Sequence, residues 1–79
     1  MKTGQIVGEN IRGFRNNKGW SQEKLGTRSK LHYNYIGCVE RGEKSISVDN
    51  LAKIAKALKT PIEKFFEEGF YRDVKGDKE

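Results

Sequence analysis

The chain has 79 residues and a single cysteine, Cys38, so it supports one small domain and excludes an internal disulfide framework. No apolar run approaches the roughly 18 residues of a membrane span and no signal-peptide core follows Met1, so we expect a soluble protein of the reducing cytoplasm. The net charge of +5 lies in residues 1–46, where nine Lys or Arg face four Asp or Glu, which indicates either a surface for a polyanion or ordinary solvated charge.

Hydrophobic spacing predicts a first helix over about residues 5–17. Val7, Ile11 and Phe14 recur at helical intervals and form one apolar stripe. Gly19 follows the stripe and suits the left-handed geometry that ends many helices. We therefore expect this helix to bury its stripe and to end just before Gly19.

A second, short helix is predicted over residues 22–28. Ser21 is a favoured N-cap residue, and Leu25 is the strong apolar residue of the segment. Trp20 precedes the cap and is expected to act as a hydrophobic staple. One apolar residue cannot hold a helix of this length, so the helix must pack on others.

A third helix is predicted over residues 33–41, ending at Gly42. Ile36 and Val39 are its inward apolar pair, and Tyr35 lies beside them. About four residues join it to the second helix, and both helices must pack on the first and the fourth. This arrangement predicts a helix-turn-helix, in which the second of the two helices projects its outer side into a DNA major groove.

Residues 48–58 form the fourth predicted helix, with Ser47 as its N-cap. The apolar residues of this segment have the most regular helical spacing in the chain, so we expect them to face the core. They are Val48, Leu51, Ile54, Ala55 and Leu58.

A fifth helix is predicted over residues 61–68. Thr60 and Pro61 fit the N-cap and the first helical position, where the missing N–H of proline costs nothing. The remaining residues, about 70–79, predict a flexible tail. Because no segment alternates for long enough to form a strand, the sequence predicts an all-α fold of five helices in one domain.

The segment that contains these helices resembles a known family of DNA-binding proteins. The sequence IRGFRNNKGWSQEKLGTRSKLHYNYIGCVERGEKSISVDNLAKIAKAL has a Ser-Gln-Glu-x-Leu opening and a Tyr-Ile-x-x-Val-Glu-Arg-Gly exit. Both are typical of the phage repressor and Cro (XRE) type of helix-turn-helix domain, and small restriction–modification controller proteins look most similar. The resemblance covers residues 6–68 and implies a lambda-repressor-like fold that binds DNA as a dimer.

The outer side of the third helix carries the candidate base contacts. Asn34, in the first turn, can pair with adenine N6 and N7, and Tyr33 can contact a base edge, a thymine methyl or a phosphate. Gly37 would let the groove approach the backbone, and Cys38 is interpreted as a small neutral contact residue. The alternatives are an ordinary polar residue at Asn34 and an ordinary surface glycine at Gly37. Related domains often have arginine in place of Tyr33 and asparagine in place of Ser45, so we expect a different DNA sequence to be read.

Four residues are candidates for contacts with the DNA backbone. The resemblance implies that Gln22 bridges a phosphate and the third helix, and N–H groups at a helix start also hold phosphates. An ordinary polar residue at a helix start is the alternative for Gln22. After the third helix, Arg41, Lys44 and Ser45 are suited to positioning the protein without specifying sequence.

The resemblance also implies an ion pair between Arg15 of the first helix and Glu40 of the third. Related domains join this pair across the two helices, partly buried. Such a pair would fix the angle of the third helix more than it stabilises the fold, because desolvation offsets the attraction. Two separate solvated charges are the alternative.

Catalytic and metal sites are not expected. Cys38 could sense oxidants on a basic surface, although a neutral contact residue is the favoured interpretation. His32 lies six positions before Cys38 on a different helical face, so the two cannot act as base and nucleophile. One His and one Cys also cannot complete a zinc site, and no cofactor is expected.

The favoured hypothesis is a dimeric transcription regulator, repressor or activator, that binds a palindromic operator in double-stranded DNA. RNA polymerase is a further candidate partner. Binding to a membrane is not expected. The alternative is an antitoxin, which generally needs an extra segment to block its toxin, whereas the eleven residues from Gly69 onward are largely polar. An enzyme is disfavoured because the chain lacks a nucleophile–base set or a metal set.

Dimerisation is expected because one recognition helix reads only a few base pairs. A self-complementary patch away from the DNA must supply the interface. The fifth helix is the candidate, with Ile62 assigned mainly to the core and Phe66, in preference to Phe65, assigned to the partner. Phe70 and Tyr71 could extend this patch. The alternative is that both Phe65 and Phe66 close the monomer core.

Overall fold

The computed structural model describes residues 2–73. This part of the chain contains four α-helices and two 3-10 segments, joined by turns and loops. This part contains no strand, which confirms the predicted all-α fold, and none of its helices is long and apolar enough to cross a membrane. The helices are α1 (Thr3–Asn17), α2 (Gln22–Ser29), α3 (Tyr33–Glu40) and α4 (Val48–Ala57), and the 3-10 segments are η1 (Ile62–Phe66) and η2 (Phe70–Asp73).

Serine side chains cap α2 and α4 where the sequence predicts their starts. The Ser21 hydroxyl oxygen accepts a hydrogen bond from the Lys24 backbone N–H at 3.0 Å. The Ser47 hydroxyl oxygen accepts one from the Asn50 backbone N–H at 3.1 Å. Gly19, with φ +73°, turns the chain after α1 in the left-handed conformation that glycine adopts without strain.

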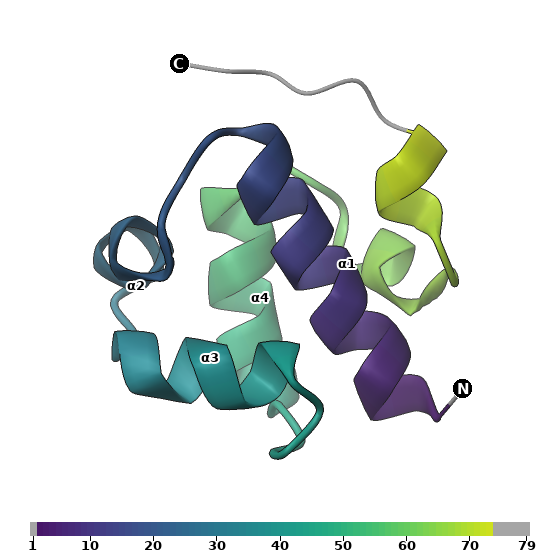
Figure 1. The fold of residues 1–79 in the computed structure, drawn as a ribbon, viewed down its shortest axis with the longest axis horizontal. Helices are drawn as coiled ribbons and strands as arrows, with labels where there is room; N and C mark the ends of the chain where they lie inside the picture. Colours follow the sequence, from purple (N-terminus) through teal and green to yellow (C-terminus); the bar gives the residue numbers. More distant parts are fainter. Residues whose placement is uncertain (1, 74–79) are drawn as a thin grey trace.

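The core forms where α1, α3, α4 and η1 meet. In Figure 1, α1 crosses diagonally over α4, α2 lies to the left, and α3 runs across the lower edge. The apolar stripes of α1 and α4 are both buried in this core together with Leu25 of α2, because each stripe must be removed from water. The buried apolar residues are Val7, Ile11, Phe14, Trp20, Leu25, Ile36, Val39, Leu51, Ile54, Ala55, Leu58 and Phe65.

Trp20 is buried at the junction between α1 and α2, where the sequence places a staple. Three cations surround its ring, since Lys18, Lys24 and Arg28 all lie 5.2–5.3 Å from the ring centroid. The negative face of the indole attracts these charges. Trp20 therefore both closes the core and lies among three cations from α2 and the end of α1.

Val48 is exposed (73%), although the sequence predicts it to belong to the inward stripe of α4. It is the first residue of α4, directly after the cap, so its side chain precedes the part of the helix that packs on the core. A polar contact holds this end instead, because the Asn50 side-chain amide donates to the Tyr35 hydroxyl at 3.2 Å.

The end of the described chain differs from the prediction. The 3-10 segment η1 replaces the predicted α-helix over residues 61–68, and residues 70–73, predicted to belong to a flexible tail, form η2. Thr60 does not cap η1, because its hydroxyl donates to the carbonyl oxygen two residues before it at 3.1 Å, and Pro61 occupies the N-cap position. The remainder of the predicted tail, 74–79, lies outside the described residues.

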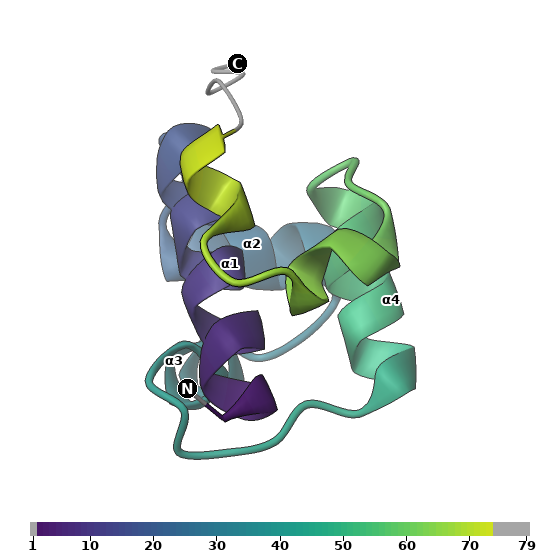
Figure 2. The ribbon, with the colours of Figure 1, turned by 90° about the vertical axis from the view of Figure 1, so that its right-hand side faces the viewer.

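A buried asparagine in α1 explains why the chain does not continue as an α-helix after η1. The Asn10 side-chain amide donates to the carbonyl oxygens of Phe65 and Glu67, both at 2.8 Å, and its oxygen accepts from the Tyr71 backbone N–H at 3.3 Å. These bonds satisfy backbone groups that a continued α-helix would have satisfied internally. The chain therefore turns after η1 and returns along α1, where Figure 2 shows η2 lying. Gly13 allows this packing, because a Cβ there would collide with the Tyr71 ring.

Candidate nucleic-acid interface

The predicted helix-turn-helix is formed by α2 and α3. Lys30 ends α2 in the left-handed conformation, with φ 60°, and the Leu31 backbone N–H donates to the Gly26 carbonyl oxygen at 2.9 Å. Gly26 also permits the turn to pack closely on α2, because a Cβ there would lie 2.6 Å from the Leu31 carbonyl oxygen. The turn is thus short and closed by its own hydrogen bonds, which fixes α3 relative to α2.

His32 caps α3, a role that the sequence analysis did not assign to it. Its Nδ1 accepts a hydrogen bond from the Asn34 backbone N–H at 3.0 Å, and its ring stacks on the Tyr33 ring with centroids 4.7 Å apart. Histidine is not among the favoured N-cap residues, so residue type alone did not indicate this contact. The cap and the stack hold the first turn of α3, where two candidate base contacts lie.

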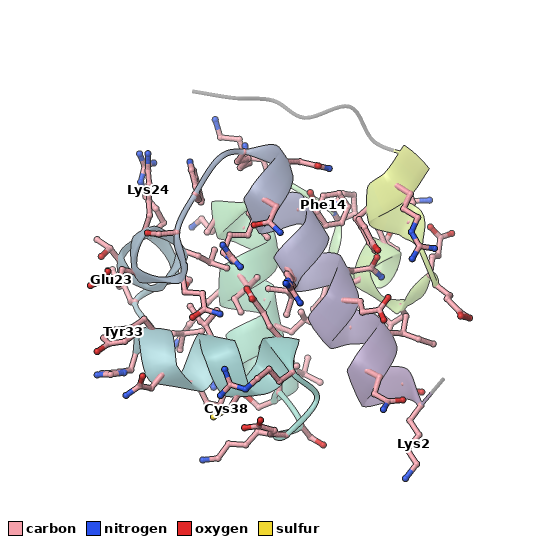
Figure 3. The ribbon with its side chains drawn as sticks, viewed as in Figure 1. Lys2, Phe14, Glu23, Lys24, Tyr33 and Cys38 are labelled. Atoms are coloured by element: carbon pink, nitrogen blue, oxygen red, sulfur yellow. The ribbon has the colours of Figure 1, made fainter. Side chains whose placement is uncertain are left out.

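The candidate base contacts Tyr33, Asn34 and Cys38 share the outward side of α3. Ile36 and Val39 are buried in the core, which directs the opposite side of the helix to solvent. Tyr33 and Asn34 are exposed, and Cys38 is half-buried one turn further along. Figure 3 shows Tyr33 at the end of α3 next to α2 and Cys38 in the half nearer to the following loop. The structure therefore brings these three side chains onto one surface.

Gly37 is buried beneath neighbouring side chains, and its close approach to a groove stays a prediction. A Cβ at this position would lie 3.1 Å from Arg41 Nη1 and 3.3 Å from Gln22 Oε1. Its lack of a side chain leaves room for these two polar groups to fold over the centre of α3. The surface there is consequently made by Gln22 and Arg41.

A buried polar network joins α1, α2 and α3. Arg15 donates from Nε to Glu40 Oε2 at 2.7 Å and from Nη2 to Glu40 Oε1 at 3.0 Å. Arg15 Nη1 also donates to the Trp20 carbonyl oxygen at 2.8 Å, and Gln22 Nε2 donates to Glu40 Oε1 at 3.1 Å. Both charged residues are buried, so the fork geometry of Arg15 sets the position of α3 against α1 and against the start of α2.

Arg41 forms an ion pair with Glu43 that the sequence analysis did not predict. Its Nε lies 2.8 Å from Glu43 Oε2, its Nη2 lies 3.3 Å from Oε1, and Nη2 is also 3.6 Å from Cys38 Sγ. The hydrogen bonds between the two side chains raise the pKa of Arg41 and lower the pKa of the Glu43 carboxyl. Both side chains are more than half exposed (56% and 55%), so the pair is weak and Arg41 can exchange Glu43 for another anion.

Lys44 and Ser45, the other candidate backbone contacts, are exposed in the loop between α3 and α4. This loop follows the carboxyl end of α3 directly, so the side chains adjoin the outward surface of that helix. Within residues 2–73, no group of three or more His, Cys, Asp and Glu is placed to hold a metal ion.

Residues 11–65 match the family model described as helix-turn-helix (HTH_3). This match spans more than half of the chain. The chain belongs to the helix-turn-helix family.

Related proteins and solved structures agree with this assignment. The control protein C.SmaI of Serratia marcescens is 44% identical to this helix-turn-helix protein over 64 residues, which cover 81% of this chain and 76% of that protein. The control protein C.BamHI of Bacillus amyloliquefaciens is 44% identical over 54 residues, 67% of each chain. The restriction-modification controller protein C.AhdI from Aeromonas hydrophila superposes with a TM-score of 0.77 at 38% identity, covering 80% of this chain and 96% of that one. The hypothetical transcription factor NHTF from Neisseria superposes with a TM-score of 0.83 at 34% identity, covering 90% and 82%.

The helix-turn-helix protein is therefore a DNA-binding transcriptional regulator of the XRE and Cro type and not an enzyme. The predicted resemblance and the lambda-repressor-like fold are both confirmed. Its DNA-binding unit is the α2–α3 pair, which lies inside the matched range 11–65.

Phe65 of the helix-turn-helix protein belongs to the monomer core, so it does not share the interface role for which the sequence analysis preferred Phe66. It is fully buried (0%), and its ring packs edge-on against Phe14 with centroids 5.3 Å apart. Phe70 is half-buried and also packs on Phe14, at 5.5 Å. Phe66 is exposed (49%), which leaves it as the phenylalanine of η1 that a partner can reach.

Proposed function

We propose that this protein is a restriction–modification controller that binds a palindromic operator as a homodimer. The observation that carries the proposal is the first turn of α3, where Tyr33 and Asn34 are exposed and held by the His32 cap. Recognition helices reach base edges from this turn. The control proteins described above, with 44% identity to this chain, support the more specific assignment to a controller.

In the proposed complex, the outward side of α3 enters the major groove. Asn34 reads adenine through its side-chain amide, Tyr33 contacts a neighbouring base or a phosphate, and Cys38 lies against the groove as a small neutral side chain. These contacts specify sequence, whereas contacts to phosphates position the protein.

The proposed phosphate contacts come from Gln22, Arg41, Lys44 and Ser45. Gln22 precedes the other residues of α2, so the N–H groups at the start of this helix adjoin its side chain. Arg41 would exchange the carboxylate of Glu43 for a phosphate, because its pair with Glu43 is exposed and weak. Lys44 and Ser45 would contact the backbone from the following loop.

The proposed homodimer places two copies of α3 against two half-sites. One short helix reads too few base pairs for specific binding, so a second copy must supply the other reader. Phe66 is the exposed apolar residue of η1 around which the interface would form, and Phe70 would extend it. Such a regulator works in the cytoplasm beside the DNA, and RNA polymerase is the further partner that an activator would contact.

Selection of bound duplexes from a random pool tests this function. We expect enrichment of an inverted repeat whose half-sites are centred about one helical turn, roughly 10 base pairs, apart. The double variant Tyr33→Ala/Asn34→Ala is the control, and it should fold but enrich no common sequence. A pool that stays random with the unmodified protein would reject the proposal.

A further inference from the structure

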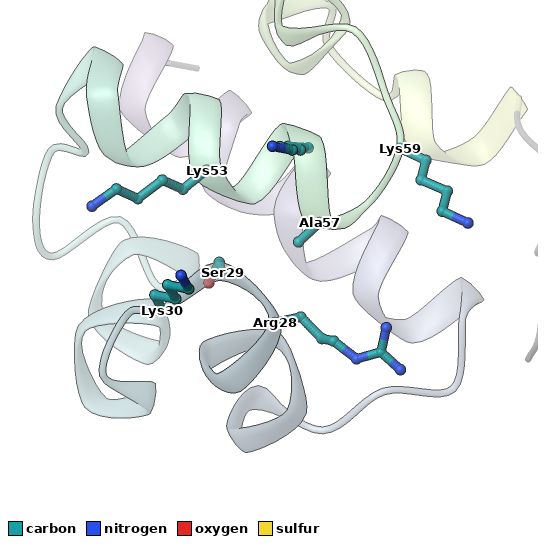
Figure 4. A pocket seen from close by; sticks show the side chains of 7 residues that line it. Arg28, Ser29, Lys30, Lys53, Ala57 and Lys59 are labelled. Carbon is teal, nitrogen blue, oxygen red and sulfur yellow. The ribbon is translucent and has the colours of Figure 1, made fainter.

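A basic cleft of about 400 Å³ lies between the end of α2 and the carboxyl half of α4. Figure 4 shows α2 supplying one wall and α4 the other, with Ala57 and Ser29 as small side chains between the cations. Among the described residues that line the cleft, five are Lys or Arg and none is Asp or Glu. The lining residues are Arg28, Ser29, Lys30, Lys53, Lys56, Ala57 and Lys59.

The proposed DNA surface does not account for this charge. The candidate contacts to bases and phosphates come from the start of α2, from α3 and from the loop after it, and none of them lines the cleft. The cleft instead follows α4 toward its carboxyl end (Figure 4). Arg28 also lies over the Trp20 ring, and the four lysines concentrate positive charge that attracts an anion.

Two of these lysines occupy backbone conformations that favour glycine. Lys30 has φ 60° and Lys59 has φ 53°, whereas the other positive-φ residues of the described chain are Gly19, Gly42 and Gly69. A residue with a Cβ is strained in this left-handed region, and glycine is not. The carboxyl end of a helix attracts cations, but a lysine in the last helical turn can satisfy this attraction without backbone strain. Both strained lysines line the same cleft. Strained residues of this kind are typical of binding sites, so the position of the two charges points to a binding function.

We infer that the cleft binds an acidic, extended segment of a partner protein, an activity beyond the proposed DNA binding. Successive side chains of an extended chain point to opposite sides, so alternating carboxylates would meet the two basic walls in turn. The small side chain of Ala57 leaves room for the backbone of such a segment, and Ser29 is buried at the base of the cleft. A DNA duplex is convex and wide, and it would touch only the rims of this concave site. The volume also lies in the range of roughly 300–1,000 Å³ that is usual for ligand sites.

The test uses the double variant Lys30→Gly/Lys59→Gly in the full chain. Glycine removes two charges and relieves both left-handed conformations, so the variant should melt at the same or a higher temperature than the unmodified protein. The probe is a fluorescein-labelled decapeptide of alternating Glu and Ala, compared with a peptide of Gln and Ala. The acidic peptide should bind the unmodified protein, shift the amide resonances of Ser29 and Ala57, and bind the variant about tenfold more weakly at low salt.

A matched control variant, Arg12→Gln/Lys64→Gln, removes the same charge from residues that do not line the cleft. It should bind the acidic peptide nearly as well as the unmodified protein does. Lys53→Gln/Lys56→Gln, which leaves the turns intact, should lose binding as the glycine variant does. Equal losses in the matched control, peptide-induced shifts confined to α3, or shifts of Ser29 and Ala57 caused by a non-operator duplex would each overturn the proposal.

Discussion

A neighbouring side chain holds the first turn of α3, where the proposed base contacts Tyr33 and Asn34 lie. His32 caps the helix through the Asn34 backbone N–H, and its ring stacks on the Tyr33 ring. Preorganised side chains lose less conformational entropy on binding than mobile ones. At the residue scale, recognition in our proposal therefore depends on these supporting contacts as well as on the residues that touch DNA.

Asn34→Ala should weaken binding to the selected operator by about 1–3 kcal/mol and relax preference at one base pair, because a bidentate contact to adenine is lost. Lys44→Ala is the comparison, and it should weaken operator and unrelated duplexes alike, because a phosphate contact carries no sequence information. Dissociation constants for the operator and its single-base variants measure both effects. An equal loss on every duplex for Asn34→Ala would mean that Asn34 does not read a base.

Residue types alone could indicate part of this surface. The spacing of Ile36 and Val39 gave the correct inward side of α3, and hence the outward positions of Tyr33 and Asn34. The sequence could not show that Gln22 and Arg41 cover Gly37, because no spacing rule fixes the direction of such long side chains.

At the scale of the helices, α1 and α3 meet closely at Gly8. A Cβ at Gly8 would collide with the Val39 carbonyl oxygen, which belongs to the backbone and cannot move by a rotamer change. Gly4 lies one turn earlier, and a Cβ there would meet nothing within 4 Å. The two glycines therefore form a matched pair in one helix.

Gly8→Ala should lower the free energy of unfolding by about 1–3 kcal/mol, because the added methyl group pushes α3 away from α1. Gly4→Ala should leave it unchanged or raise it by up to about 1 kcal/mol, because alanine favours the helix. Urea unfolding followed by circular dichroism measures both variants. Gly8→Ala as stable as Gly4→Ala would show that the helices do not approach as described.

Glu40→Ala should cost about 3–5 kcal/mol of unfolding free energy, because it leaves the buried Arg15 guanidinium without its carboxylate. The double variant Arg15→Met/Glu40→Leu should lose much less, because neither charge is then buried. Its operator affinity should still fall, since the position of α3 depends on the fork of Arg15. Equal free energies of unfolding for the two variants would show that an unpaired buried Arg15 is not the cause of the loss.

The first four helices could be predicted from periodicity and caps, because these signals are local. The 3-10 course of η1 and η2 could not, because it depends on Asn10 binding carbonyl groups 55 and 57 residues away. A local pattern contains no information about such a partner. Thr60-Pro61 has the composition of a helix start, but the distant hydrogen bonds decide the conformation that follows it.

At the scale of the whole molecule, our proposals concern three separate surfaces: the outward side of α3, the basic cleft and the exposed edge of η1. The sequence analysis preferred Phe66 over Phe65 for an apolar interface in this last region, although residue types alone do not distinguish two adjacent phenylalanines. Adjacent residues differ by only about 100° around a helix, and packing against Phe14 decided which of the two is buried.

Phe66→Lys should produce a folded monomer with weakened operator binding, because a charge in the proposed apolar interface opposes association. Sedimentation equilibrium gives the mass, and circular dichroism reports the fold. Glu63→Lys, an exposed change in the same segment, is the control and should remain a dimer. A Phe66→Lys protein that stays dimeric would exclude Phe66 from the interface.

The dependence of affinity on half-site spacing tests the central claim, that two copies of α3 read DNA together. In a symmetric dimer the two helices lie about 34 Å apart and face the same side of the duplex. Inserting about five base pairs between the selected half-sites turns one of them to the opposite side. We predict that fluorescence anisotropy will show the affinity falling to that of a single half-site. An affinity unchanged by the insertion, or a single half-site bound as tightly as the pair, would contradict the account.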